Sequence, residues 1–191
     1  MANSKLIVIE GAQGAGKTTI TDFLRHSLKH TNLYRLSGTS DSTVNGLPKA
    51  QEMYEDLLEY LKKLENKSIN LLFDRTFFTE ENYCRLGKKE YSFTEVYNEL
   101  LETFSKLDFD IYYITLYLRD ESLYEQRILR EGKAVVDYAK FTAENSIEQQ
   151  REYLKMADEI KSKYSEINVY NVANDRDIEE VKAELKEILD F

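Results

Sequence analysis

Residues 6–19, LIVIEGAQGAGKTT, carry the strongest structural signal in this chain of 191 residues. The first part, residues 6–9, is apolar and mostly β-branched, which predicts a short strand that is buried on both faces. A glycine-rich turn follows at residues 11–16, and a helix is expected to open at Lys17. A buried strand that turns directly into a helix is typical of an α/β protein with a parallel sheet.

The same stretch carries a phosphate-binding pattern. Gly11, Gly16, Lys17 and Thr18 match the spacing G-x-x-x-x-G-K-[ST], in which backbone N–H groups and a helix N-terminus converge on phosphate. Lys17 is expected to reach the β- and γ-phosphates, and the Thr18 hydroxyl to ligate Mg²⁺. An ordinary strand-to-helix turn is the alternative. The complete pattern favours a nucleoside triphosphate site formed by Gly11, Ala12, Gln13, Gly14, Ala15, Gly16, Lys17, Thr18 and Thr19.

Composition favours one acidic domain over residues 1–191. Apolar residues make up 42% of the chain and charged residues 32%, and no apolar segment is long enough to span a membrane. The single cysteine, Cys84, excludes an internal disulfide. A net charge of −9 opposes nonspecific binding to a polynucleotide. With no signal peptide at the N-terminus, we expect a cytoplasmic protein without a stable nucleic-acid or membrane partner.

Apolar periodicity predicts alternating strands and helices along the rest of the chain. The expected strands are residues 32–36, 68–74, 110–118 and 166–172, and the expected helices are residues 18–30, 49–65, 76–87, 91–106, 119–132, 142–164 and 177–189. Turn-forming residues fill positions 37–48, which suggests a loop that faces either the substrate or the solvent. The order predicts a three-layer α/β/α fold, with a five-stranded, mainly parallel sheet and helices on both faces.

Charged residues follow the strand at 68–74. Asp74 ends this apolar run, and ligands of open α/β sheets bind beyond the carboxyl ends of the strands. We therefore expect Asp74 to hold Mg²⁺ next to Thr18, although a helix-capping role is the simpler alternative. Arg127 and Arg130 lie on one side of a later helix, just before a weakly periodic segment. They either offset the helix dipole or form a phosphate clamp in a lid at residues 128–142, and we favour the clamp.

Three segments together resemble the thymidylate kinase-like nucleotide kinases, which are close relatives of the deoxynucleoside kinases. IEGAQGAGKTT (9–19) is similar to the phosphate loop of that family, DRTFFTEENY (74–83) to its D-R-x-x-x-S-x-x-x-Y segment, and EQRILREGK (125–133) to its lid. The resemblance runs over nearly the whole chain. It implies a P-loop kinase fold, ATP and Mg²⁺ as cofactors, and a homodimer.

The resemblance also implies roles for residues at the matching positions. Lys17 and Arg127 or Arg130 would serve the donor phosphates, Arg75 would hold the phosphate of the acceptor, and residues 172–175 would border adenine. The expected acceptor site comprises Gln13, Arg35, Gln51, Arg75, Thr79, Asn82 and Tyr83. The chain departs from many relatives by having Gln13 where they carry a carboxylate. It also lacks an arginine in residues 49–65 and has LSGTSDS after the second strand.

The chemistry of the acceptor separates the remaining functions. A nucleoside hydroxyl must lose a proton, whereas a monophosphate is already an oxyanion and needs cations to position it. Arg75 and Arg35 supply such cations, while Asp41 is the sole carboxylate in the loop at residues 37–48. The sequence therefore favours a deoxynucleoside monophosphate kinase, with thymidylate as the first acceptor to test. The alternatives are a deoxynucleoside kinase that reads the base through Gln51, and a nucleotide-binding regulatory protein without catalysis.

Overall fold

The strand Lys5–Glu10 (β1) lies at the centre of a parallel sheet in the computed structural model, which describes residues 4–131 and 142–191. Within these residues the sheet has five strands in the order β2-β3-β1-β4-β5, and every neighbouring pair is parallel. The other strands are Thr31–Arg35 (β2), Asn70–Asp74 (β3), Asp110–Tyr117 (β4) and Ile167–Ala173 (β5). The first strand thus sits between β3 and β4, so the loop that follows it opens at the middle of the sheet.

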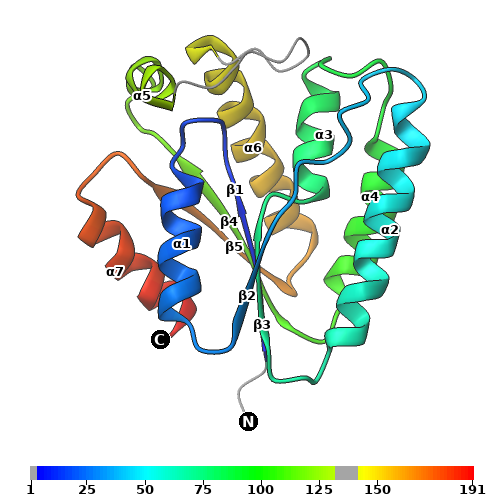
Figure 1. Cartoon of the computed structure of the whole chain (residues 1–191), viewed down its shortest axis with the longest axis horizontal. Coiled ribbons are helices and arrows are strands. Elements are labelled where there is room, and N and C mark those ends of the chain that lie inside the picture. Colours follow the sequence, from blue (N-terminus) through cyan, green and yellow to red (C-terminus); the bar gives the residue numbers. More distant parts are fainter. Residues whose placement is uncertain (1–3, 132–141) are drawn as a thin grey trace.

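Helices cover both faces of the sheet (Figure 1). One layer consists of Lys17–Ser27 (α1) and Ile178–Leu189 (α7). The other consists of Gly46–Leu64 (α2), Phe77–Arg85 (α3), Thr94–Ser105 (α4) and Ala143–Lys163 (α6), while Leu123–Glu131 (α5) lies beside the loop after β1. The predicted α/β fold with its three layers and five-stranded parallel sheet is confirmed.

Alternate side chains of β1 enter two separate cores. Leu6 and Val8 pack with the layer that contains α2, α4 and α6, whereas Ile7 and Ile9 pack with α1 and α7. All four side chains are fully buried, as the apolar run predicted. Burial on both sides leaves β1 little freedom to move, so the loop at its carboxyl end begins from a rigid strand.

Several helix boundaries differ from those predicted: α1 ends at Ser27 and not at residue 30, and α4 begins at Thr94 and not at residue 91. Two further differences have a local cause. Helix α2 begins at Gly46 and not at residue 49, because Pro48 in a first turn costs no internal hydrogen bond. Helix α5 begins at Leu123 and not at residue 119, because the Asp120 carboxylate accepts hydrogen bonds from the backbone N–H and hydroxyl of Ser122 and holds a turn there. Most of the lid predicted at residues 128–142 lies outside the described residues. Among the described helices, none is both long and apolar enough to cross a membrane.

Candidate active site

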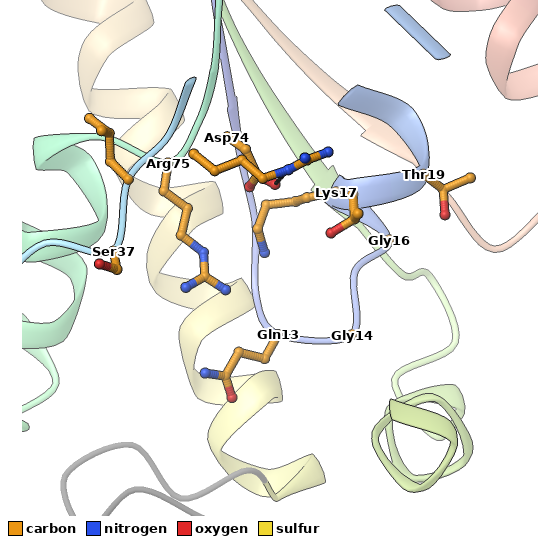
Figure 2. A pocket seen from close by; sticks show the side chains of 11 residues that line it. Gln13, Gly14, Gly16, Lys17, Thr19, Ser37, Asp74 and Arg75 are labelled. Carbon is orange, nitrogen blue, oxygen red and sulfur yellow. Dashed lines mark ion pairs between the residues drawn. The ribbon is translucent and has the colours of Figure 1, made fainter. Parts of the chain in front are cut away.

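An open cavity of about 280 Å³ lies at the carboxyl ends of β1 and β3, where α/β sheets bind their ligands. Figure 2 shows it framed by the loop after β1, with Lys17 and Arg75 pointing into the space. The lining residues come from this loop, from α1, and from the ends of β2 and β3. They are Gln13, Gly14, Gly16, Lys17, Thr18, Thr19, Arg35, Leu36, Ser37, Asp74 and Arg75.

The loop after β1 has the backbone shape that phosphate binding requires. Gly16 precedes α1 with φ 90°, in the left-handed region, and no side chain caps the first turn of this helix. The N–H groups at the start of α1 are therefore available to an anion. A side chain at Gly11 is excluded as well, because its Cβ would lie 2.5 Å from the carbonyl oxygen of Leu116. Gly11, Ala12 and Ala15 are buried beneath the cavity and shape the loop without lining it.

Lys17 places its ammonium group inside the loop. Its Nζ donates hydrogen bonds to the carbonyl oxygens of Gly11 at 2.7 Å and Ala12 at 2.9 Å. Only 6% of the residue is exposed, so the charge acts in a partly desolvated environment where Coulomb interactions are stronger than in water. The geometry fits an ammonium that bridges the loop and a bound phosphate.

Arg127 and Asn174 fasten the outer side of the same loop. The Arg127 guanidinium donates to the carbonyl oxygens of Gly14 at 3.2 Å and Asn174 at 2.6 Å. The Asn174 amide donates to the carbonyl oxygen of Ala15 at 2.7 Å. Arg127 thus lies next to the loop, as the resemblance implied, although it does not line the cavity. The Arg130 side chain lies outside the described part of the structure.

Asp74 and Thr18 both line the cavity, which is what the predicted magnesium site requires. Asp74 is the single carboxylate among the described residues that line it, and only 7% of this residue is exposed. No group of three or more metal-binding side chains occurs in the described ranges. One carboxylate and one hydroxyl suit Mg²⁺, which keeps most of its waters and takes its remaining ligands from phosphates. The residues present therefore fit this ion.

Arg75 is the second cation of the cavity. Its backbone has φ 72°, a left-handed conformation that side-chain-bearing residues rarely adopt. Burial acts to lower the pKa of Arg75. Nearby groups, of which Tyr153 has the largest effect, raise this pKa by more, so the net pKa lies above the ordinary arginine value and the side chain stays charged. Within residues 4–131 and 142–191, no ion pair or hydrogen bond holds its guanidinium. Arg75 is partly buried and opens onto the cavity. The nearby Asp74 and Glu10 carboxylates act on its charge, but neither forms an ion pair with it in the described residues. A guanidinium in this position can bind an anion.

Arg35 also lines the cavity, but carboxylates hold it. Its Nη2 lies 2.6 Å from Asp22 Oδ1, and its Nε lies 3.6 Å from Asp74 Oδ2. The Asp22 pair is exposed to solvent and so contributes little to stability. Arg35 could therefore exchange its ion pair with Asp22 for one with a bound phosphate at little cost in free energy.

The remaining predicted acceptor residues differ in their surroundings. Gln13 lines the cavity and donates to the Tyr83 hydroxyl at 3.3 Å, which joins the phosphate loop to α3. Gln51 does not line it, and its amide donates to Glu55 one turn further along α2. Asn82 is fully buried and donates to the carbonyl oxygen of Gln149 at 3.1 Å. The structure thus brings Gln13 and Tyr83 to the cavity side and holds Gln51 and Asn82 in other contacts.

Thr79 lies inside the protein and contacts Glu10, a residue that no sequence pattern had indicated. Its hydroxyl donates to Glu10 Oε2 at 2.8 Å, and the Thr76 backbone N–H donates to Glu10 Oε1 at 2.9 Å. Burial raises the pKa of the Glu10 carboxyl to about 7, although both hydrogen bonds favour its charged form. Lys17 and Arg75 also favour the charged form. A buried carboxylate thus lies close to both Lys17 and Arg75.

Asp41 does not line the cavity and is held by its own loop. Its carboxylate pairs with Lys49 at 2.5 Å and accepts hydrogen bonds from the hydroxyl and backbone N–H of Thr43. The Lys49 hydrogen bond, together with those from Thr43, lowers the pKa of Asp41 to about 2. A carboxylate in this state is a weak base, so its surroundings do not suit the removal of a proton from a nucleoside hydroxyl.

Comparison with solved structures supports the fold. The chain is similar to thymidylate kinase from Candida albicans, with 18% identity, a TM-score of 0.68, and coverage of 100% of this chain and 92% of that one. It is also similar to deoxyadenosine kinase from M. mycoides with bound dCTP, with 18% identity, a TM-score of 0.62, and coverage of 97% and 98%. Neither the comparison with protein-family models nor that with curated proteins found a match. The chain therefore has the thymidylate kinase-like P-loop kinase fold that its motifs predicted.

Proposed function

We propose that this protein transfers the γ-phosphoryl group of MgATP to the phosphate of a deoxynucleoside monophosphate, giving the diphosphate and ADP. The observation that carries the proposal is the pairing of two cations in one cavity. Lys17 lies within the phosphate loop, and Arg75 faces the same space without an ion-pair partner among the described residues. Two anionic reactants repel each other, so a site that joins them needs positive charge toward each one.

Each group of the cavity has a part in this reaction. The amides of the loop and Lys17 would hold the donor phosphates, and Arg75 would hold the acceptor phosphate through its planar fork of donors. Asp74 and the Thr18 hydroxyl would hold Mg²⁺, which supplies charge neutralisation on the transferred group when it is bound. An oxygen of the acceptor phosphate forms the new bond to phosphorus, and the bond to the β-phosphate oxygen of ATP breaks. A homodimer and a cytoplasmic location belong to the same proposal.

An acceptor panel tests the proposal. The protein is incubated with MgATP and either a deoxynucleoside or its monophosphate, for each of the four DNA bases, and ADP release is followed. We expect release to depend on a monophosphate, with thymidylate tested first. Release that depends only on nucleosides would favour the deoxynucleoside kinase. Tight ATP binding without transfer to any acceptor would favour the regulatory protein.

The alternative acceptor, a nucleoside, needs a base for its 5′-hydroxyl proton. Asp74 is the sole carboxylate lining the described part of the cavity, and in this proposal it serves the metal. Asp41 is paired with Lys49 and lies outside that lining. The monophosphate therefore fits the cavity better, because it requires no base.

The variant Asp41→Asn tests this choice. We expect kcat and the KM of either substrate to change by no more than about two-fold, because Asp41 acts in a surface ion pair and a loop turn. Steady-state kinetics with the acceptor found in the panel provide the measurement. The control is Lys49→Met, which removes the other partner of the pair and should behave alike. A loss of turnover of about 100-fold in Asp41→Asn alone would make Asp41 the base and favour the nucleoside.

A further inference from the structure

The backbone of Arg75 requires support from its surroundings. A left-handed φ of 72° is unfavourable for an arginine, and it persists only where neighbouring contacts fix it. Arg75 N–H donates to the carbonyl oxygen of Ile9 at 3.2 Å, which ties the turn to β1. The next N–H along the chain, that of Thr76, donates to Glu10 Oε1 at 2.9 Å. Two consecutive residues of β1 therefore hold two consecutive N–H groups of this turn.

Glu10 is itself held in one position. It is fully buried at the carboxyl end of β1, and its second oxygen accepts the Thr79 hydroxyl at 2.8 Å. The Tyr153 hydroxyl on α6 donates to Thr79 at 2.9 Å and extends the network to another helix. Thr76 and Thr79 donate directly to the carboxylate, which as a charged group can only accept, and Tyr153 supports Thr79 from behind.

The carboxylate also supplies what the start of α3 lacks. Thr76 is the N-cap residue of this helix, but its own side chain makes no capping hydrogen bond. A negative group close to a helix N-terminus is favourable because of the helix dipole. Glu10, at the end of β1, thus caps the N-terminus of α3, which begins two residues after Arg75.

We propose that Glu10 is a positioning residue, whose carboxylate holds the turn at Arg75 in the left-handed conformation that points the guanidinium into the cavity. Its negative charge also offsets Lys17 and Arg75 when no phosphate is bound. Glu10 does not line the cavity, so it acts through Arg75 and not on the substrate. The kinetic part of this inference rests on the proposed function, whereas the structural part does not.

The kinetic test compares Glu10→Gln with the wild type. The glutamine keeps one oxygen for the Thr76 N–H but loses the charge and one acceptor. We expect kcat/KM for the acceptor to fall by about 10- to 100-fold, with the KM for ATP unchanged, because displacement of a positioning group by about an ångström costs this much. Glu81→Gln is the matched control, since Glu81 is an equally buried carboxylate that bonds Arg85 and Thr94 away from the cavity. It should leave both KM values unchanged.

A double-mutant cycle separates positioning from general loss of structure. In an Arg75→Lys background, Glu10→Gln is expected to have little further effect on kcat/KM for the acceptor, because the group through which it acts has changed. If the double variant instead loses kcat/KM by the full product of the two single losses, the two residues act independently and the proposal is overturned. Equal losses for ATP and acceptor in Glu10→Gln with Arg75 intact would also overturn it.

Crystal structures of the substrate-free variants test the inference independently of any reaction. In Glu10→Ala we expect the φ of Arg75 to leave the left-handed region and the guanidinium to leave the cavity. If Glu10→Ala does not fold, Glu10→Gln serves with a smaller expected displacement. An unchanged Arg75 in the folded variants would overturn the proposal. The two proposals can fail separately. If the wild type phosphorylates no acceptor but Arg75 is displaced in the Glu10 variants, the proposed function is overturned and the positioning role of Glu10 stands.

Discussion

Replacing Lys17 by methionine is expected to lower kcat for phosphoryl transfer by about 10²- to 10³-fold, because the ammonium stabilises charge that develops on the transferred group. Methionine keeps an unbranched stem of similar size and removes the charge. The carbonyl oxygens of Gly11 and Ala12 lose a donor, which should lower the free energy of unfolding by about 1 kcal/mol. Single-turnover kinetics and thermal unfolding measure the two effects separately.

A matched control for this variant is Lys29→Met. Lys29 is an exposed lysine just beyond the C-terminal end of α1 and does not line the cavity, which lies at the other end of this helix. We expect turnover and thermal unfolding to stay at wild-type values in this control. Wild-type turnover in Lys17→Met would show that the loop does not act on the reacting phosphates, and the mechanism would have to be abandoned.

Replacing Arg75 by glycine is expected to separate activity from stability. The substitution removes the cation that the acceptor phosphate would bind, so kcat/KM for the acceptor should fall by about 10²- to 10³-fold while the KM for ATP stays near its wild-type value. Glycine adopts a positive φ without strain, so the substitution removes about 1 kcal/mol of backbone strain from the folded state. This gain offsets the loss of stability that arises because an unfolded glycine has more conformational freedom than an arginine. We therefore expect the melting temperature to remain at or above that of the wild type.

Arg75→Lys is the companion variant, since it keeps a charge but loses the planar pair of donors. An intermediate loss of acceptor kcat/KM is expected, because a lysine binds phosphate as a point charge. The prediction fails if Arg75→Gly phosphorylates the acceptor as the wild type does. It also fails if the ATP and acceptor KM values rise together, because Arg75 would then not be specific to one substrate.

The parts of the site that are local in sequence were predictable. The conformation of the loop between Gly11 and Thr18 depends on neighbouring residues. Its glycines stand where the backbone has a positive φ or where a side chain would clash, and the spacing pattern of the motif records these requirements. Asp74 follows from the rule that ligands lie beyond the carboxyl ends of parallel strands. The role of Arg75 was implied by the resemblance of residues 74–83 to a kinase motif. The sheet and its two helix layers follow from the alternation of apolar segments.

The buried network beneath the cavity was not predictable in this way. Glu10 adjoins an apolar strand, and its partners Thr76 and Thr79 lie 66 and 69 residues away. Thr79 was assigned to the acceptor from a motif, but only the three-dimensional arrangement shows its hydroxyl bonded to Glu10. A sequence signal does exist, because a carboxylate at the end of a fully apolar strand needs buried donors. The identity of those donors depends on how α3 and α6 pack.

In the proposed mechanism one cavity binds two phosphate-bearing ligands, one through Lys17 and the loop amides and the other through Arg75. A crystal structure of the protein with Mg²⁺, a non-hydrolysable ATP analogue and the monophosphate selected by the panel is the decisive test. We expect the β- and γ-phosphates within hydrogen-bond distance of Lys17 Nζ and the amides of residues 11–16, and the acceptor phosphate on the Arg75 guanidinium. A nucleotide bound outside this cavity, or an acceptor phosphate that makes no contact with Arg75, would contradict this mechanism.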